Sequence, residues 1–221
     1  MSKALRYSNL VAKFKQYQFL DADLTNPHNI PGFHYDVISP WELWQSNLDA
    51  EIMLIGQDYS DISSLIYNIN NDWEKEKNCY TNQTLIRLLN FLKYDLKVDY
   101  DGENIHSLFF TNAILGIKNG NMSTPVKTGW WKETLEYLRE LIDIVQPKYV
   151  IAMGRTAYDA ICSIHNIRPH NDMKKAIGAK IPLTDDRDLF VLYHCSPLGK
   201  RNRPLLLQES DWNKVAELMM I

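Results

Sequence analysis

The chain has 221 residues, of which 45% are hydrophobic and 23% are charged, and its formal net charge is -3. This composition predicts a soluble single-domain protein with one sizeable core. The negative net charge excludes binding to nucleic acid through the electrostatic field of the whole protein, so such binding needs a local basic cluster. The three cysteines are scattered without a CxxC pair, which excludes a disulfide framework and a cysteine-based metal site. No apolar run suits a signal peptide or a membrane span, and we expect a cytoplasmic protein.

Hydrophobic periodicity predicts helices and strands that alternate along most of the chain. The first forty residues are expected to form an N-terminal extension, with a weakly amphipathic helix at residues 4–19 and a proline-containing loop at residues 26–40. Further helices are predicted at residues 41–48, 82–94, 130–145, 156–164 and 210–220. Buried strands are predicted at residues 52–55, 107–115, 149–153 and 189–193. This alternation favours right-handed βαβ units, so we expect an α/β fold, a three-layer α/β/α sandwich with a central, mainly parallel four-stranded sheet.

Polar residues follow three of the predicted strands. Gln57 and Asp58 come after the first strand, Asn112 lies near the end of the second, and His194 follows the fourth. Because the carboxyl ends of parallel strands share one edge of a sheet, we expect a carboxylate, an amide and an imidazole to converge on one pocket. Each residue alone is explained as a polar turn or a hydrogen-bonded core residue, and the prediction of a site rests on their combination.

The fourth strand leads into a basic loop. Leu198 lies near its tip beside Lys200, Arg201 and Arg203. An apolar side chain among cations suits insertion into a base stack, with the cations on the flanking phosphates. The alternative is a surface loop with a chance cluster of charge.

Other cations are weaker candidates for phosphate contacts. Lys118 and Lys127 lie in the glycine-containing loop after the second strand, where a solvated lysine is the default interpretation. Gly154 and Arg155 precede the helix after the third strand and could bind a phosphate at its N-terminus, although capping is the simpler explanation.

Three short motifs, in order along the chain, carry a family resemblance. They are Gly56-Gln57-Asp58, the segment Phe-Thr-Asn-Ala at residues 110–113, and His-Cys-Ser-Pro-Leu at residues 194–198. They resemble the uracil-DNA glycosylase superfamily, which has a Gly-Gln-Asp-Pro-Tyr type loop, an asparagine ending a second strand, and a closing His-Pro-Ser-Pro-Leu followed by a basic residue. The match runs from about residue 51 to 205 and leaves residues 1–40 outside it.

The resemblance implies hydrolysis of the bond between an aberrant base, most simply uracil, and its deoxyribose in DNA. Asp58 would orient the attacking water and stabilise the oxocarbenium-like sugar, and His194 would donate a hydrogen bond to O2 of the leaving base. Asn112 would read the pyrimidine edge, with Gln57 in the same pocket. The implied partner is DNA with a damaged base, bound by a monomer without a metal or another cofactor. Base flipping would be supported by DNA contacts from Ser196, Leu198, Lys200, Arg201 and Arg203.

The chain departs from the family pattern at two places. Tyr59 and Ser60 replace the proline and tyrosine after the aspartate, so the aromatic that would bar the thymine methyl group is a serine. Either Tyr59 takes that place through a one-residue shift, or the pocket tolerates 5-substituted pyrimidines. Cys195 replaces a proline, and we interpret it as a small buried residue.

Spacing does not identify the aromatic on which a flipped base would stack. Tyr80, just before the helix at residues 82–94, is preferred over Tyr67 and Trp73.

Two other functions remain open at this stage. The altered residues 59, 60 and 195 are compatible with a non-catalytic module that binds uracil or DNA. A nucleotide or nucleoside enzyme that uses the same sheet edge is the third possibility.

Overall fold

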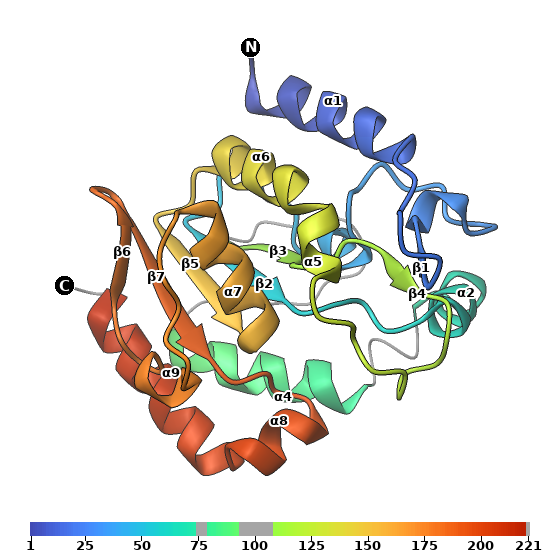
Figure 1. The fold of residues 1–221 in the computed structure, drawn as a ribbon. Coiled ribbons are helices and arrows are strands. Elements are labelled where there is room, and N and C mark those ends of the chain that lie inside the picture. Colours follow the sequence, from blue (N-terminus) through green and yellow to red (C-terminus); the bar gives the residue numbers. More distant parts are fainter. Residues whose placement is uncertain (74–78, 93–107, 220–221) are drawn as a thin grey trace.

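The computed structural model describes residues 1–73, 79–92 and 108–219 (Figure 1). Its centre is a five-stranded sheet in the order β3-β2-β5-β7-β6. The strands are β2 (Ile52–Gly56), β3 (Leu108–Asn112), β5 (Tyr149–Met153), β6 (Ile181–Thr184) and β7 (Arg187–Leu192). The first three and β7 run parallel, and β6 is antiparallel to β7. The four predicted strands and the mainly parallel sheet are therefore confirmed.

The fifth strand, β6, is the element of this sheet that the sequence does not predict. Its four side chains alternate between half-buried and exposed, and Pro182 lies within it. A proline is tolerated at a sheet edge, where one side of the strand needs no hydrogen bonds. A segment of four residues carries little periodic signal. The sequence therefore predicts four strands, whereas the sheet has five.

Helices cover both faces of the sheet, as Figure 1 shows. Successive strand residues point to opposite faces, so Met53 and Ile55 enter one core cluster while Ile52 and Leu54 enter another. The first face is covered by α1 (Lys3–Lys15), α6 (Leu135–Val145) and α7 (Arg155–Ile164). The second face is covered by α4 (Tyr80–Leu89) and α9 (Leu205–Met219). The three-layer α/β/α architecture is thus as predicted.

Shorter elements connect these layers. The helices are α2 (Ile62–Asn70), α5 (Trp130–Glu133) and α8 (Pro197–Asn202), together with the 3-10 helices η1 (Pro27–Asn29), η2 (Pro40–Leu43), η3 (Asn90–Leu92) and η4 (Met173–Lys175). A second, two-stranded sheet pairs β1 (Leu24–Thr25) with β4 (Ile117–Lys118). No helix in the described ranges is both long and apolar enough to cross a membrane.

Several boundaries differ from the predicted ones. The helix predicted at 41–48 is only the 3-10 helix η2, the last helix begins at Leu205 instead of residue 210, and α2 was not predicted. The helix predicted at 82–94 begins at Tyr80, and its residues 93–94 lie outside the described part, as does residue 107 of the predicted second strand.

A fully buried acid, Glu42, links the N-terminal helix to the sheet. The hydroxyl of Tyr7 on α1 donates a hydrogen bond to this carboxyl group, as does Thr111 Oγ1 on β3 at 3.0 Å and the backbone N–H of Ile38 at 3.2 Å. Burial raises the pKa of Glu42 to about 7, while these hydrogen bonds oppose the rise. Residues before position 43 therefore help to hold the end of β3.

Candidate active site

The ends of β2 and β3 meet directly at the carboxyl edge of the sheet. Gly56 and Asn112 are partners in the parallel ladder. A Cβ atom on residue 56 would lie 2.5 Å from Oδ1 of Asn112, closer than any real contact of a Cβ. A glycine is needed here because the buried amide of its neighbour fills the space where a side chain would begin.

The amide of Asn112 is held from one side. Its Nδ2 donates to Oγ of the buried Ser39 at 3.4 Å. Its Oδ1 is buried and has no hydrogen-bond partner among the described residues. A buried acceptor without a partner costs about 1–3 kcal/mol, so the site favours a ligand that brings a donor to this oxygen.

The carboxylate of Asp58 is held at both oxygens. Gln57 Nε2 donates to Oδ1 at 3.0 Å, and the ammonium of Lys118 lies 3.1 Å from Oδ2. Gln57 is fixed in turn by Thr156 at the start of α7, whose Oγ1 donates to Oε1 at 3.2 Å. The side chain of Asp58 is only 12% exposed. Gln57 and Lys118 set its orientation directly, and Thr156 does so through Gln57.

His194 follows β7, at the same edge of the sheet as Asp58 and Asn112. Burial lowers the pKa of this imidazole, and the negative charge of Asp58 opposes the effect. The backbone N–H of Ser196 donates to Nδ1 at 3.2 Å. A neutral ring that accepts at Nδ1 carries its proton on Nε2, so His194 offers an N–H donor without a positive charge.

The loop after His194 is folded tightly against it. Ser196 caps α8 by accepting from the N–H of Gly199 at 3.3 Å. A Cβ on residue 199 would lie 1.6 Å from the carbonyl oxygen of His194, so this helix can approach the histidine only with glycine at that position. Cys195 is buried, which raises the pKa of its thiol to about 12 and agrees with a packing role.

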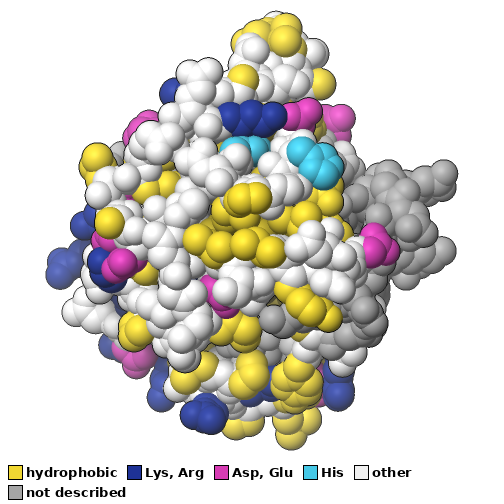
Figure 2. All heavy atoms as spheres, turned by 90° about the vertical axis from the view of Figure 1, so that its right-hand side faces the viewer, with side chains coloured by type: hydrophobic (Ala, Val, Ile, Leu, Met, Phe, Trp, Pro, Cys, Tyr) yellow, Lys and Arg dark blue, Asp and Glu magenta, His cyan; other side chains and the backbone are white. Residues whose placement is uncertain are grey.

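The residues predicted to contact DNA fall into two groups. Leu198 is 65% exposed on α8, and Arg201 is exposed next to it. Lys200 is held over the ring of Tyr80, 3.3 Å from its centroid, and donates to Thr84 Oγ1 at 3.0 Å. Figure 2 shows the right-hand side of the molecule in Figure 1. At its lower end, at the height of α8, hydrophobic side chains lie beside lysines and arginines. Leu198 and Arg201 are thus the accessible members of the predicted interface.

Arg203 lies in a different environment from the one predicted. Its guanidinium donates to both oxygens of Asp211 on α9, at 2.8 and 2.6 Å. Lys127 is likewise paired with Asp21 and Asp23, at 3.0 and 2.7 Å. The structure gives both cations acidic partners within the chain.

The predicted aromatic residues also have specific places. Tyr59 is 1% exposed in a hydrophobic cluster, where its hydroxyl accepts from Asn68 Nδ2 at 3.0 Å and its ring packs on Trp41. Tyr80 is 59% exposed at the start of α4, and Tyr67 is 48% exposed on α2. Trp73, by contrast, is buried in the same cluster as Tyr59. Tyr80 is therefore an exposed residue near α8 whose ring is covered on one face by the ammonium of Lys200, while Tyr59 is a core residue.

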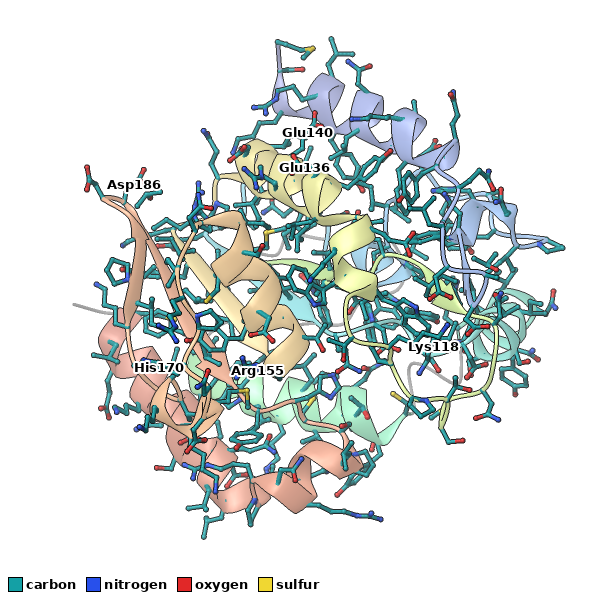
Figure 3. All side chains as sticks on the ribbon, viewed as in Figure 1. Lys118, Glu136, Glu140, Arg155, His170 and Asp186 are labelled. Atoms are coloured by element: carbon teal, nitrogen blue, oxygen red, sulfur yellow. The ribbon has the colours of Figure 1, made fainter. Side chains whose placement is uncertain are left out.

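Sequence reasoning missed Ser39 and gave Lys118 a different role from the one that the structure shows. Ser39 supports Asn112, and Lys118, labelled in Figure 3, pairs with Asp58 instead of lying in solvent. Neither has a motif that marks it. Arg155, also labelled, donates to Asp159 and to the carbonyl oxygens of residues 170 and 171.

Comparison with known proteins identifies the family of this chain. A family model of the uracil DNA glycosylase superfamily matches residues 43–216. A search of curated proteins finds no match. In the described part of the chain, no group of three or more His, Cys, Asp or Glu side chains could hold a metal ion. The matched range covers most of the chain and includes Asp58, Asn112 and His194, so the chain belongs to the uracil-DNA glycosylase superfamily.

Proposed function

We propose that this protein hydrolyses the N-glycosidic bond of uracil, or of a related deaminated base, in DNA. Membership of the superfamily supports a DNA glycosylase in general. The observation that carries the finer proposal is the buried Oδ1 of Asn112, which lacks a partner among the described residues and lies at the strand edge that also carries Asp58.

Base selection follows from the two ends of the Asn112 amide. Uracil presents a donor at N3 and an acceptor at O4, which complement the amide oxygen and nitrogen. Cytosine presents an acceptor and an amino group at the same positions, so it would leave buried polar groups mismatched. Ser39 fixes the amide and favours one orientation of the base.

We assign bond cleavage to Asp58 and His194, which follow parallel strands at the same edge of the sheet. As the bond from C1′ to N1 lengthens, positive charge grows on the sugar and negative charge on the base. The carboxylate stabilises the sugar and orients a water toward C1′, while Nε2–H of His194 donates to O2 of the leaving base. A neutral imidazole serves this purpose, because it stabilises the departing anion without transferring a proton.

Access to the base requires that it leaves the DNA stack. Leu198 is exposed on α8, close in sequence to His194, and suits the gap that a flipped base leaves. Arg201 and Lys200 follow on the same helix and supply positive charge for phosphates.

The proposed substrates include uracils with a substituent at C5. Ser60 stands where the family pattern has a bulky aromatic, and its backbone has a φ of 68°, a left-handed conformation that side chains rarely adopt. Tyr59 is fixed in the core cluster by Asn68, which argues against its taking over that barrier.

The test is a base-release assay on oligonucleotides with uracil, hypoxanthine, xanthine or 5-substituted uracils, in single and double strands. We expect release of free base, reduced roughly 10²–10³-fold or more in Asp58→Asn and in His194→Ala. Asp186→Asn, at the turn between β6 and β7, is the control and should match the wild type (Figure 3). Full activity in both site variants would refute the residue roles, and no release from any substrate would refute the function.

A specific observation also favours the second candidate, a module that binds uracil or DNA without turnover. Both oxygens of Asp58 already have partners within the protein, Gln57 at Oδ1 and Lys118 at Oδ2. Tight binding to uracil-containing DNA without release of base would support this function over the enzyme.

A further inference from the structure

Lys118 is an unusually buried lysine. Its side chain is 6% exposed, and its ammonium lies 3.1 Å from Oδ2 of Asp58. The same nitrogen lies 3.4 Å from the carbonyl oxygens of Met122 and Thr124. The buried ammonium thus has two hydrogen-bond acceptors and one ion-pair partner.

The backbone of Lys118 is fixed as firmly as its side chain. It pairs with Leu24 in the antiparallel ladder of β1 and β4 and forms a parallel bridge with Asp61 in the loop that carries Asp58. Lys148 offers a contrast, because its side chain is 56% exposed and lies 3.7 Å from Glu51 at the opposite end of the sheet. The first pair is built into the site, and the second is an ordinary surface pair.

We infer that Lys118 is a positioning residue that holds the Asp58 carboxylate in its reactive orientation. This inference rests on the proposed function. Gln57 restrains Oδ1 and Lys118 restrains Oδ2, so the carboxylate cannot rotate without losing one of these partners. The restraint matters for the reaction, because the carboxylate can stabilise the sugar cation only when it points toward C1′.

The arrangement also leaves the Asp58 carboxylate able to act on the substrate although a cation lies beside it. The negative charge of Asp58 acts to raise the pKa of His194, and both residues follow parallel strands at the same edge of the sheet. The ammonium is anchored on the loop side, by residues 122 and 124. Lys118 therefore acts through Asp58 and needs no contact with the substrate.

The first measurement is a kinetic double-mutant cycle with Lys118→Met, Asp58→Asn and the double variant, in single-turnover base release. We expect Lys118→Met to lower the rate roughly 10–100-fold with KM changed less than about threefold, and Lys118→Arg to recover part of the loss. In the Asp58→Asn background the methionine should have no further effect. Lys148→Met is the matched control and should keep the wild-type rate. Unchanged rates in Lys118→Met, or effects that multiply in the double variant, would overturn the inference.

The second measurement needs no activity and uses urea unfolding of the same variants. Removal of the ammonium leaves a buried charge alone, so Lys118→Met should be destabilised, and removal of both charges should restore part of the stability. If Lys118→Met does not fold but the double variant does, the result also supports the pairing of Lys118 with Asp58. Additive effects would overturn the pairing. Wild-type protein without base release refutes only the proposed function, and this unfolding cycle still decides whether Lys118 holds Asp58.

Discussion

The buried carboxyl group of Glu42 should make the stability of the protein depend on pH near neutrality. Its donors are Tyr7, Thr111 and the backbone of Ile38, and it has no exposure to solvent. Glu42→Gln removes the titration with little change of shape. The amide oxygen can accept from Tyr7 and Ile38, and the amide nitrogen can donate to the hydroxyl of Thr111.

The magnitude follows from the difference between the folded and unfolded states. Burial raises the pKa of Glu42 from 4.5 to about 7 in the folded protein. Because folding raises the pKa, the folded state favours the protonated carboxyl group of Glu42. The stability that Glu42 contributes is therefore fully present below pH 4.5 and is lost as the pH rises through 7. At about 1.4 kcal/mol for each pH unit, this interval corresponds to a loss of about 3 kcal/mol that the glutamine variant should not show.

Urea unfolding, followed by tryptophan fluorescence between pH 4.5 and 8, measures this difference. Glu42→Gln should have a free energy of unfolding close to that of the wild type at pH 4.5 and exceed it by about 3 kcal/mol at pH 8. Glu136→Gln is the control, because that side chain is 77% exposed on α6, and it should follow the wild type within about 0.5 kcal/mol. A difference between Glu42→Gln and the wild type that stays constant over this range would refute the reasoning.

Three further predictions concern the basic loop and the histidine. Arg201→Ala should weaken binding to DNA and reduce the slope of log K against log salt by about one, in fluorescence anisotropy titrations, because the side chain is exposed. Arg203→Ala should instead lower the free energy of unfolding by about 1–3 kcal/mol through loss of the bidentate pair with Asp211, and a reduced salt slope without lost stability would contradict this assignment. For His194, nitrogen NMR should find the proton on Nε2 at pH 7 and a titration midpoint below 6.5, since burial lowers its pKa and the N–H of Ser196 occupies Nδ1. A proton on Nδ1, or a midpoint above 6.5, would contradict the proposed hydrogen bond to O2.

The carboxyl edge of the sheet was predictable because a buried parallel strand is a short apolar run, and the residues next in sequence must lie at its end in space. That local rule places Asp58 and Asn112 at the ends of β2 and β3, and His194 just beyond β7. The motif order then identifies the family, which the match over residues 43–216 confirms.

The partners of these residues were not predictable, because burial and pairing depend on segments far apart in the chain. From the sequence, Lys118 is expected to be a solvated lysine in a loop. It becomes buried only because β4 pairs with β1 and Asp58 lies against its ammonium. The sequence places Arg203 in a basic loop, and its pair with Asp211 forms only when α9 packs beside that loop. The edge strand β6 has only four residues, one of them a proline, and is too short to be recognised before β7 pairs with it.

The sequence by itself determined the α/β alternation, the family and the three polar strand ends of this protein. The tertiary structure decided which cations remain accessible, which residues hold the Asp58 carboxylate, and that Tyr59 belongs to the core. The physical reason is that backbone periodicity is encoded locally, whereas the solvent exposure and charge partner of a side chain are set by residues that meet it only after folding.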